Sequence, residues 1–397
     1  MKICLITDDY LPLSRKVAGK MMHELALEFK SRGHNVTVVT PSSKLKKSFE
    51  ISQLDGVTVC HFRSGEIKNV SKVKRAINET LLSYYAWRAF KPYFKQDHHD
   101  LIIYYSPTIF WGGLVSRLKK LWGASSYLIL RDFFPQWVID NGLLCANSPI
   151  TQYFRLFEAL NYRAADTIGV QLPKDVECFC EISHIQRRLD ILYNWAAIES
   201  ATVVTGDFRK TLGLENKVVF FYGGNIGQAQ DMMNIVRLAQ AMRQELDAHF
   251  LLVGAGDQVE LVREAIAEND LNNMTLLPSV NQDVFKGMLK EFDVGLFSLH
   301  HDHTTDNCPG KLLAYMVQEK PILGSVNPHN DLRGMLEKAK AGLVSVNGDD
   351  AALLNNALKL LRDSNLRVSL GSNAKKLLSD IFSVEAAANR ILAAMRN

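Results

Sequence analysis

Short apolar runs and longer amphipathic stretches alternate along the chain. Residues 3–6 are apolar, and the apolar residues of 21–29 recur at helical spacing before Gly33. A second apolar run, 36–39, follows directly. A buried strand, an amphipathic helix and another strand in this order predict a βαβ unit with parallel strands.

The alternation then continues in two series. The first includes apolar runs at 101–105, 127–130 and 167–170, and the second has runs at 218–222, 250–253, 274–277, 294–297, 322–323 and 343–346. Between them lie turn residues such as Thr205, Gly206 and Asp207. We therefore predict an α/β protein with two doubly wound lobes, residues 1–200 and 201–383.

Composition agrees with a two-domain globular protein. The chain has 397 residues, of which 47% are apolar, and this is enough for two cores. A net charge of +4 is too weak to indicate nucleic-acid binding. Residues 1–9 reach acidic residues after one short apolar run, so we expect neither a signal peptide nor a membrane span, and a cytoplasmic location.

Cysteine and histidine patterns do not predict a metal site. The six cysteines lack the paired spacing of metal or redox motifs, which favours reduced structural thiols. Successive residues such as His300, His301 and His303 cannot converge on one ion without an unusual loop. We expect no metal.

Positive charge is concentrated in segment 63–95, with eight basic residues against two acidic ones. Val73, Ile77 and Tyr84 recur there at helical spacing, and aromatic residues follow. Such a surface could rest on anionic lipid headgroups, whereas the alternative is a core-facing helix with a solvated basic face. The basic residues are Arg63, Lys68, Lys72, Lys74, Arg75, Arg88, Lys91 and Lys95.

Glycines follow two strands of the second series. Gly224 and Gly227 follow the 218–222 run, and Gly254 and Gly256 follow 250–253. Ligands of parallel sheets bind beyond the carboxyl ends of strands, and the alternative is that glycine only permits a tight turn there. Their joint occurrence favours a nucleotide site. The third glycine of a dinucleotide fingerprint is missing, which disfavours a nicotinamide cofactor.

Three further turns carry candidate chemistry. Pro309, Gly310 and Lys311 lead into a helix whose first N–H groups, together with the lysine charge, suit a diphosphate. Gly19 lies near the start of the first helix, where it could let a ligand approach. Arg131 and Asp132 follow the 127–130 strand and form either a ligand-facing pair or a structural ion pair.

Together these motifs resemble the family 4 glycosyltransferases. The resemblance is carried by Ala18-Gly19, Arg32 to Thr40, Gly224-Asn225-Ile226-Gly227 with Gln230, Val253 to Gly256, and Pro309 to Pro321. It implies the GT-B fold, with two Rossmann-like lobes separated by a cleft. The first lobe would bind the acceptor, the second would bind a nucleotide sugar, and helix 384–397 would pack back on the first.

Within that family, Arg131 to Pro135 and the Gly-Asn-Ile-Gly run resemble the bacterial O-antigen and capsule branch, which includes assigned L-fucosamine transferases. The resemblance implies transfer, with retention, of a sugar such as N-acetyl-L-fucosamine from a UDP-sugar to a lipid-linked oligosaccharide. Partners would be the nucleotide sugar, the acceptor and the inner face of the membrane, without nucleic acid. No cofactor beyond the donor is implied.

The resemblance also assigns roles to residues. The paired glutamates of the family fall on Asp306, which would meet the donor sugar, and on Ala314, which has no carboxylate. Its phosphate-binding arginine and lysine correspond to Asn225 and Gln230, so the diphosphate would depend on Lys311 and nearby N–H groups. The expected catalytic residues are Asp306, Lys311, Arg131 and Asp132. The expected binding residues are Gly19, Gly224, Asn225, Gln230, Gly254, Gly256, Pro278, Val280, Pro309, Gly310, Lys311 and Leu312.

Two other functions remain open at this point. A sugar-nucleotide epimerase can share the two-lobed architecture and would need no acceptor. A non-catalytic nucleotide-sugar-binding protein of the same fold would agree with the missing carboxylate at Ala314.

Overall fold

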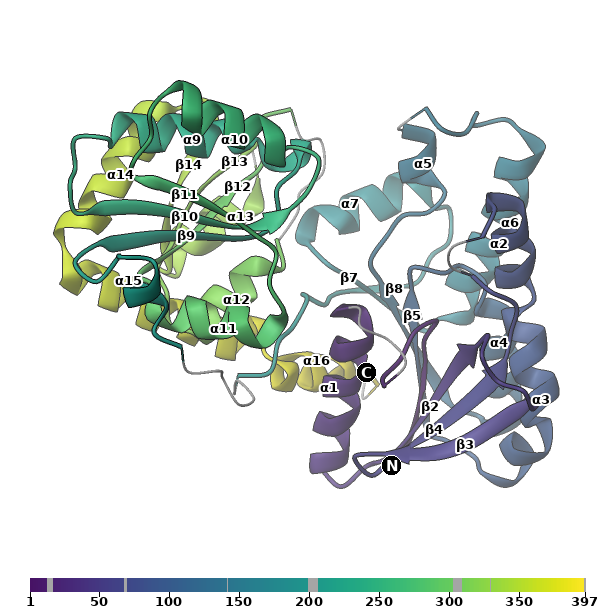
Figure 1. The fold of residues 1–397 in the computed structure, drawn as a ribbon. Coiled ribbons are helices and arrows are strands. Elements are labelled where there is room, and N and C mark those ends of the chain that lie inside the picture. The colour runs from purple at the N-terminus through teal and green to yellow at the C-terminus, as the bar shows by residue number, and fades with distance from the viewer. Residues whose placement is uncertain are drawn as a thin grey trace. The chain divides into compact units, whose positions relative to one another are not determined.

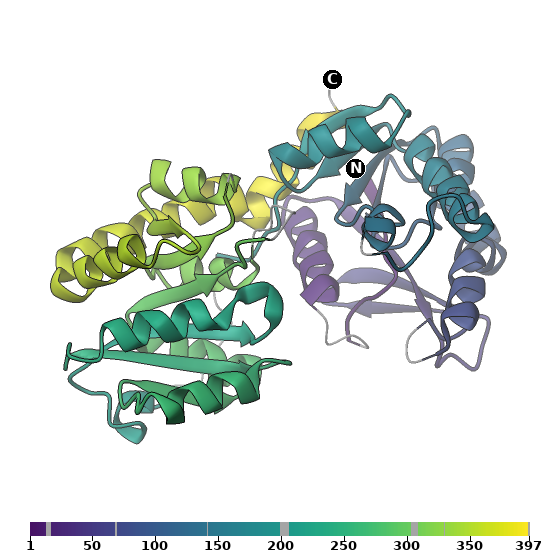
Figure 2. The ribbon, with the colours of Figure 1, turned by 90° about the horizontal axis from the view of Figure 1, so that it is seen from above.

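The computed structural model describes residues 1–12, 17–67, 70–140, 142–198, 206–302, 309–328 and 330–395. It divides into two compact units, shown in Figures 1 and 2. Unit 1 comprises Met1–Asn194 and Val384–Asn397, and unit 2 comprises Trp195–Ser383. The chain therefore leaves unit 1 once and returns to it through its last helix.

Unit 1 is built on an eight-stranded sheet of order β3-β4-β2-β1-β5-β6-β7-β8. β3 runs antiparallel to β4, and the other neighbours pair in parallel. The strands are β1 (Lys2–Ile6), β2 (Asn35–Ser42), β3 (Phe49–Leu54), β4 (Val57–Arg63), β5 (Leu101–Ser106), β6 (Ser125–Leu130), β7 (Thr167–Val170) and β8 (Arg188–Ile191).

Helices cover both faces of this sheet (Figure 1). They are α1 (Val17–Ser31), α2 (Lys72–Thr80), α3 (Leu82–Gln96), α4 (Gly112–Trp122), α5 (Gln136–Asp140), α6 (Pro149–Ala164), α7 (Pro173–Ile182) and α16 (Val384–Met395). α16 packs on α1, where Arg32 donates to the Asn389 side chain at 2.6 Å. Arg390 also donates to Asp190 at 2.7 Å, so polar contacts from two sides fix the last helix on unit 1.

The basic segment divides into two differently oriented helices. In α3, the apolar residues Leu82, Ala86, Phe90 and Phe94 recur every four residues and are fully buried. The prediction that the aromatic residues form a lipid-facing surface is therefore wrong for Phe90 and Phe94, because they fill the core, and Tyr85, Trp87 and Tyr93 pack against it. In α2 the apolar residues point outward, and Val73 is 71% exposed and Ile77 is 56% exposed.

Unit 2 is a six-stranded parallel sheet of order β11-β10-β9-β12-β13-β14. Its strands are β9 (Val218–Asn225), β10 (Ala248–Ala255), β11 (Met274–Pro278), β12 (Val294–Ser298), β13 (Ile322–Val326) and β14 (Gly342–Val346). Each contains one of the predicted apolar runs. These strands are nearly continuous in apolar residues because helices cover both faces of the sheet.

The helices of unit 2 are α8 (Phe208–Thr211), α9 (Met232–Ala241), α10 (Val259–Glu268), α11 (Gln282–Glu291), α12 (Lys311–Val317), α13 (Asp331–Lys338), α14 (Asp350–Arg362) and α15 (Ser364–Leu377), with short turns η1 (Gln228–Gln230) and η2 (Leu378–Phe382). Across the described residues, no helix of either unit combines the length and apolar character needed to cross a membrane.

Candidate functional site

The predicted binding glycines of unit 2 meet at the carboxyl edge of its sheet. In the strand register, Gly224 of β9 pairs with Gly254 of β10, which pairs with Pro278 of β11. Because neighbouring strands are spaced by about 4.8 Å, this row spans about 10 Å from Gly224 to Pro278. The edge is long enough to hold part of a nucleotide.

Two of these glycines are required by the packing of strand ends. A Cβ atom on Gly254 would lie 1.9 Å from the Gly224 carbonyl oxygen, and one on Gly256 would lie 2.0 Å from the Ile226 oxygen. They allow the loops after β9 and β10 to touch. Gly224 differs, because its φ of +122° requires glycine and its missing side chain leaves room beside Lys311.

Lys311 faces this edge because of how α12 is anchored. The Tyr315 hydroxyl donates to the Leu296 carbonyl at 2.9 Å and accepts from the Gly223 N–H at 3.2 Å, which ties the helix to β12 and β9. Residues four apart share one helix face, so Lys311 also points toward the sheet. Its Nζ lies 3.4 Å from the centre of the Tyr222 ring.

The Lys311 amine is buried, and the part of the chain that the structure describes gives it no polar partner. Among the described residues its Nζ has no hydrogen-bond acceptor. Burial lowers the pKa of Lys311 from 10.5 to about 7, since removal from water penalises the charged form. A buried cation is tolerated where an anion compensates it, so this amine marks a place for a negatively charged ligand.

The backbone around Lys311 contributes less than the sequence predicts. Leu312 N–H, one of the expected phosphate donors, already donates to the Pro309 carbonyl at 3.0 Å. Gly310 is open, with nothing within 4 Å of where its Cβ would be. Asp306 lies outside the described residues. The lysine side chain is therefore the principal feature of this turn.

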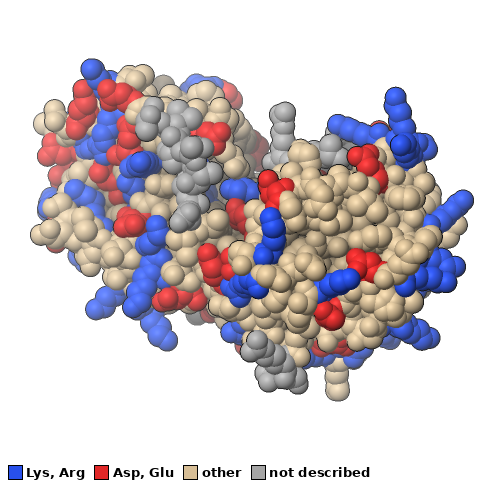
Figure 3. Space-filling view, turned by 90° about the horizontal axis from the view of Figure 1, so that it is seen from below, with Lys and Arg blue, Asp and Glu red and all other residues tan. Residues whose placement is uncertain are grey.

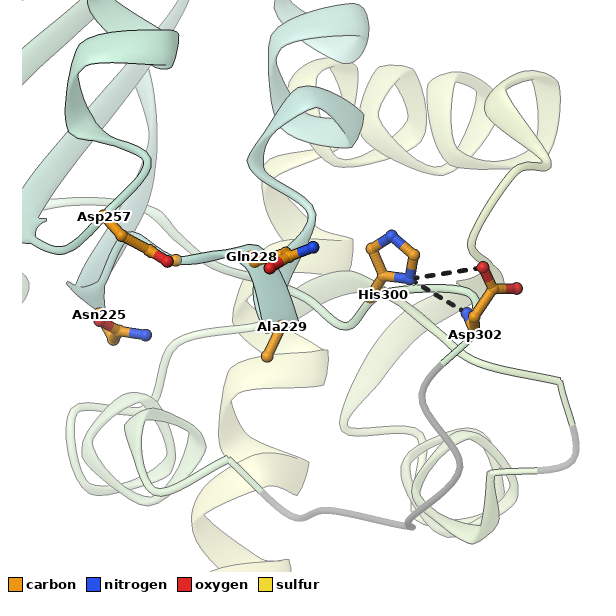
Figure 4. Close-up of a pocket in the computed structure, with 7 residues that line it drawn as sticks. Asn225, Gln228, Ala229, Asp257, His300 and Asp302 are labelled. Atoms are coloured by element: carbon orange, nitrogen blue, oxygen red, sulfur yellow. Dashed lines mark hydrogen bonds and ion pairs between the residues drawn. The ribbon is translucent and has the colours of Figure 1, made fainter. Parts of the chain in front are cut away.

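A pocket of about 450 Å³ opens at the same edge of unit 2. Figure 4 shows its walls, which come from the loops after β9, β10 and β12. Its lining residues are Asn225, Gly227, Gln228, Ala229, Asp257, His300 and Asp302. The pocket offers carboxylate, amide and imidazole groups, which suit hydroxyl groups of a ligand better than its phosphates.

Hydrogen bonds hold the walls of this pocket in place. The Asn225 side chain donates to Gln230 Oε1 at 2.8 Å, so two predicted residues do lie together. His300 N–H donates to the Ala229 carbonyl at 3.0 Å, and the Asp302 N–H donates to His300 Nδ1 at 3.2 Å. Sequence reasoning missed Asp257 and His300 as pocket residues, because each follows a strand that only the sheet order places beside β9.

The remaining predicted residues of unit 2 are peripheral to the lysine. Pro278 ends β11, and Val280 is partly exposed just beyond it. Within the described parts of the chain, no group of three or more His, Cys, Asp or Glu residues is arranged to hold a metal. His303 of the histidine-rich run lies outside those parts.

In unit 1, Arg131 makes structural contacts. Its guanidinium is buried and donates to the Leu192 carbonyl at 2.6 Å and the Tyr193 carbonyl at 3.4 Å, just after β8. Burial lowers the Arg131 pKa, and desolvation raises the pKa of Asp132 against the opposing effect of Arg131. The Asp132 side chain reaches the surface, although protein atoms desolvate its carboxyl in part, and Gly19 is buried in the first turn of α1.

Arg131→Met is expected to destabilise unit 1 by about 2 to 4 kcal/mol, because two buried carbonyls lose their donor. Urea unfolding of the full chain measures this loss, with Arg88→Met on the exposed face of α3 as the control. A variant with unchanged unfolding and a large loss of turnover would instead show a catalytic role for Arg131.

Comparisons with known proteins agree with this picture. Residues 216–363 match the family model described as "Glycosyl transferases group 1". WcaI of Escherichia coli K12, named as a colanic acid biosynthesis glycosyl transferase, is 24% identical over 314 residues, covering 75% of this chain and 76% of WcaI. WbjE of Pseudomonas aeruginosa, named as a glycosyltransferase, is 24% identical over 59% of this chain and 60% of its own length.

Solved structures share the fold over the whole chain. Anabaena HepE in complex with UDP has a TM-score of 0.68 at 15% identity, covering 100% of both chains. WaaG, a glycosyltransferase involved in lipopolysaccharide biosynthesis, has a TM-score of 0.62 at 14% identity, covering 99% of this chain and 98% of WaaG. The predicted two-lobed GT-B fold is confirmed, and within unit 2 residues 216–363 match the group 1 glycosyltransferase model.

Proposed function

We propose that this protein is a glycosyltransferase of bacterial surface polysaccharide synthesis that uses a nucleoside-diphosphate sugar. The group 1 domain and the relatives named for colanic acid and lipopolysaccharide synthesis support the reaction class. The observation that carries the donor class is the buried Lys311 amine beside Gly224, for which the described residues offer no acceptor. A diphosphate supplies the negative charge that would compensate a protonated amine at this position.

The carboxyl edge of unit 2 suggests how the donor is arranged. The diphosphate lies at Gly224 and Lys311, and the base extends along the glycine row toward Pro278 and Val280. Hydroxyl groups of the donor use the pocket of Asp257 and His300. HepE, of the same fold, has been solved with UDP, and UDP-sugars are accordingly the proposed donors.

The chemistry needs stabilisation of the departing diphosphate more than a strong base. A lysine ammonium in a site shielded from water stabilises the negative charge that develops on the leaving group. Following the family 4 resemblance, we assign Asp306 as a contact of the donor sugar. We further propose that transfer retains the configuration at the anomeric carbon and that the sugar is N-acetyl-L-fucosamine. Asp132 remains the candidate acceptor contact, whereas the contacts of Arg131 favour a structural role.

A panel of nucleotide sugars tests the donor class. UDP and UDP-sugars are expected to raise the melting temperature of the full chain, with smaller shifts from the corresponding GDP compounds. Absence of any shift at millimolar UDP would reject the proposal. Conversion of a UDP-sugar without acceptor would instead indicate an epimerase, and tight UDP binding without turnover on any lipid-linked acceptor would indicate a non-catalytic binding protein.

A lipid-linked acceptor requires the protein to approach a membrane, and unit 1 carries a suitable surface. Val73 and Ile77 of α2 and Tyr84 of α3 are exposed and follow one another at helical spacing. Thr80 lies between them at the same spacing, and its hydroxyl is 2.5 Å from the Tyr153 hydroxyl of α6. Leu156 and Leu160 follow Tyr153 at helical spacing and are also exposed. Two apolar stripes thus flank one interhelical contact, and Figures 1 and 2 show α2 beside α6.

Cationic side chains accompany these stripes. Lys74, Arg75, Arg88 and Lys91 are exposed on α2 and α3, and Figure 3 shows Lys and Arg projecting along the outer edge of unit 1, where Figure 1 places α3. Exposed aliphatic groups with a cationic rim suit an anionic bilayer. We propose peripheral binding to the inner face of the membrane through this surface.

Val73→Asp combined with Ile77→Asp is expected to weaken binding to phosphatidylglycerol-containing vesicles by about tenfold or more, since two inserting groups become anionic. Vesicle co-sedimentation at low salt measures the effect. Leu246→Asp, at a position of unit 2 that is 78% exposed, provides the matched control. Equal binding by the wild-type chain and the double variant would reject this surface.

A further inference from the structure

The surroundings of the Lys311 amine affect its protonation state as well as its attraction for phosphate. The Lys311 Nζ lies over the Tyr222 ring, and the Tyr222 hydroxyl donates to the Asn225 carbonyl at the end of β9, so the ring is held at both ends by this strand. A Cβ atom on Gly224, which lies between these two residues, would be 3.7 Å from Lys311 Cε and 3.9 Å from Nζ, so the lysine passes close to the strand here. The amine is therefore enclosed by the protein and is not exposed to solvent.

Among the described residues, the charged groups near this position do not neutralise an ammonium. Tyr222 and Tyr315, the ionisable neighbours on β9 and α12, both have pKa values raised by burial and stay protonated. β12 has no ionisable side chain along its length. On the other packed elements, Lys375 of α15 pairs with Glu319 at 3.6 Å beyond the end of α12, and Asp380 of η2 is exposed.

We propose that the Lys311 amine is largely uncharged in the empty site at pH 8 and takes up most of one proton from solvent when a nucleoside diphosphate binds. The inference rests on the proposed function, because it assigns the diphosphate to the same site. A buried amine without a hydrogen-bond acceptor among the described residues is more stable neutral than charged, and a diphosphate oxygen beside it reverses that balance. Donor binding is then coupled to proton uptake, and weakens as pH rises.

Titration calorimetry with UDP tests this coupling. At pH 8 the second ionisation of the terminal phosphate, near pH 6, is complete, so the ligand itself exchanges almost no proton. Binding enthalpies measured in Tris and in HEPES are expected to differ by the equivalent of about 0.9 proton taken up, as follows from a free-site pKa of about 7.

Two variants keep the test specific to Lys311. Lys311→Arg carries a permanent charge, so it is expected to bind UDP with nearly equal enthalpies in the two buffers. Tyr222→Phe keeps the ring and loses only the hydroxyl contact to Asn225, so its proton uptake is expected to match that of the wild type.

The outcomes separate this inference from the proposed function. UDP binding with equal enthalpies in both buffers would overturn proton uptake and leave the donor site intact. UDP binding with uptake that persists in Lys311→Arg would assign the proton to another group and also overturn the inference. Absence of UDP binding would remove both the donor site and the inference.

Discussion

Lys311→Met is expected to lower the affinity for UDP and the rate of sugar transfer by about 100-fold. Loss of one charge-assisted hydrogen bond to a diphosphate costs about 3 kcal/mol, which corresponds to that factor. Calorimetry and a transfer assay that detects released UDP measure the two effects. Lys338→Met, at an exposed lysine of α13, is the control and should bind UDP normally.

The same substitution is expected to stabilise the empty protein. The pKa of Lys311 is about 7 in the folded chain, below its ordinary value of 10.5, so the unfolded chain holds more protons between these pH values. Wild-type stability therefore rises with pH through this window. Near pH 7, Lys311→Met should raise the free energy of unfolding by about 3 to 5 kcal/mol, and the difference should narrow toward pH 10.5.

Unfolding measured at several pH values checks this prediction. A variant that loses affinity and gains stability identifies a residue kept for binding at the expense of folding. A Lys311→Met protein that is less stable than wild type at pH 7 would show that the amine is already compensated in the empty site.

Gly254→Ala is expected to destabilise unit 2 by about 3 kcal/mol or more, because overpacking against backbone cannot be relieved by a side-chain rotation. The new Cβ would lie 1.9 Å from the Gly224 carbonyl oxygen, and this contact would also displace the end of β9, which carries Asn225. Thermal unfolding of the full chain and UDP affinity should both be affected.

Gly334→Ala is the matched control for this prediction. Gly334 lies inside α13 with nothing within 4 Å of its missing Cβ, so alanine should be neutral or slightly stabilising through its helix preference. If Gly254→Ala unfolds at the same temperature as Gly334→Ala, the close approach of the two strand ends is not required for the fold.

Most buried strands were predictable from the sequence, whereas β3, β4 and β8 were not predicted. Every predicted apolar run lies in a strand, because helices cover both faces of these sheets. β3 was missed because its residues are largely exposed and form no apolar run. The Asp55-Gly56 pair did provide a hairpin signal between β3 and β4, and both residues have positive φ values of 50° and 77°.

The candidate site was predictable in position but not in chemistry. Spacing placed Lys311 at a helix start and Gly224 at a strand end, and the sheet order brings them together. Burial of the amine over Tyr222 depends on how Tyr315 anchors α12, which no local pattern contains. Likewise, the ligand-facing role of Arg131 was expected from its place after a strand. Its hydrogen-bond acceptors are the Leu192 and Tyr193 carbonyls, which are too far along the chain for a local pattern to indicate.

A crystal structure of the chain with UDP tests the diphosphate site most directly. The predicted result is a β-phosphate oxygen within about 3 Å of Lys311 Nζ beside Gly224, with the uracil toward Pro278. A diphosphate bound elsewhere on unit 2, with the Lys311 amine still buried against Tyr222 and unpartnered, would contradict it.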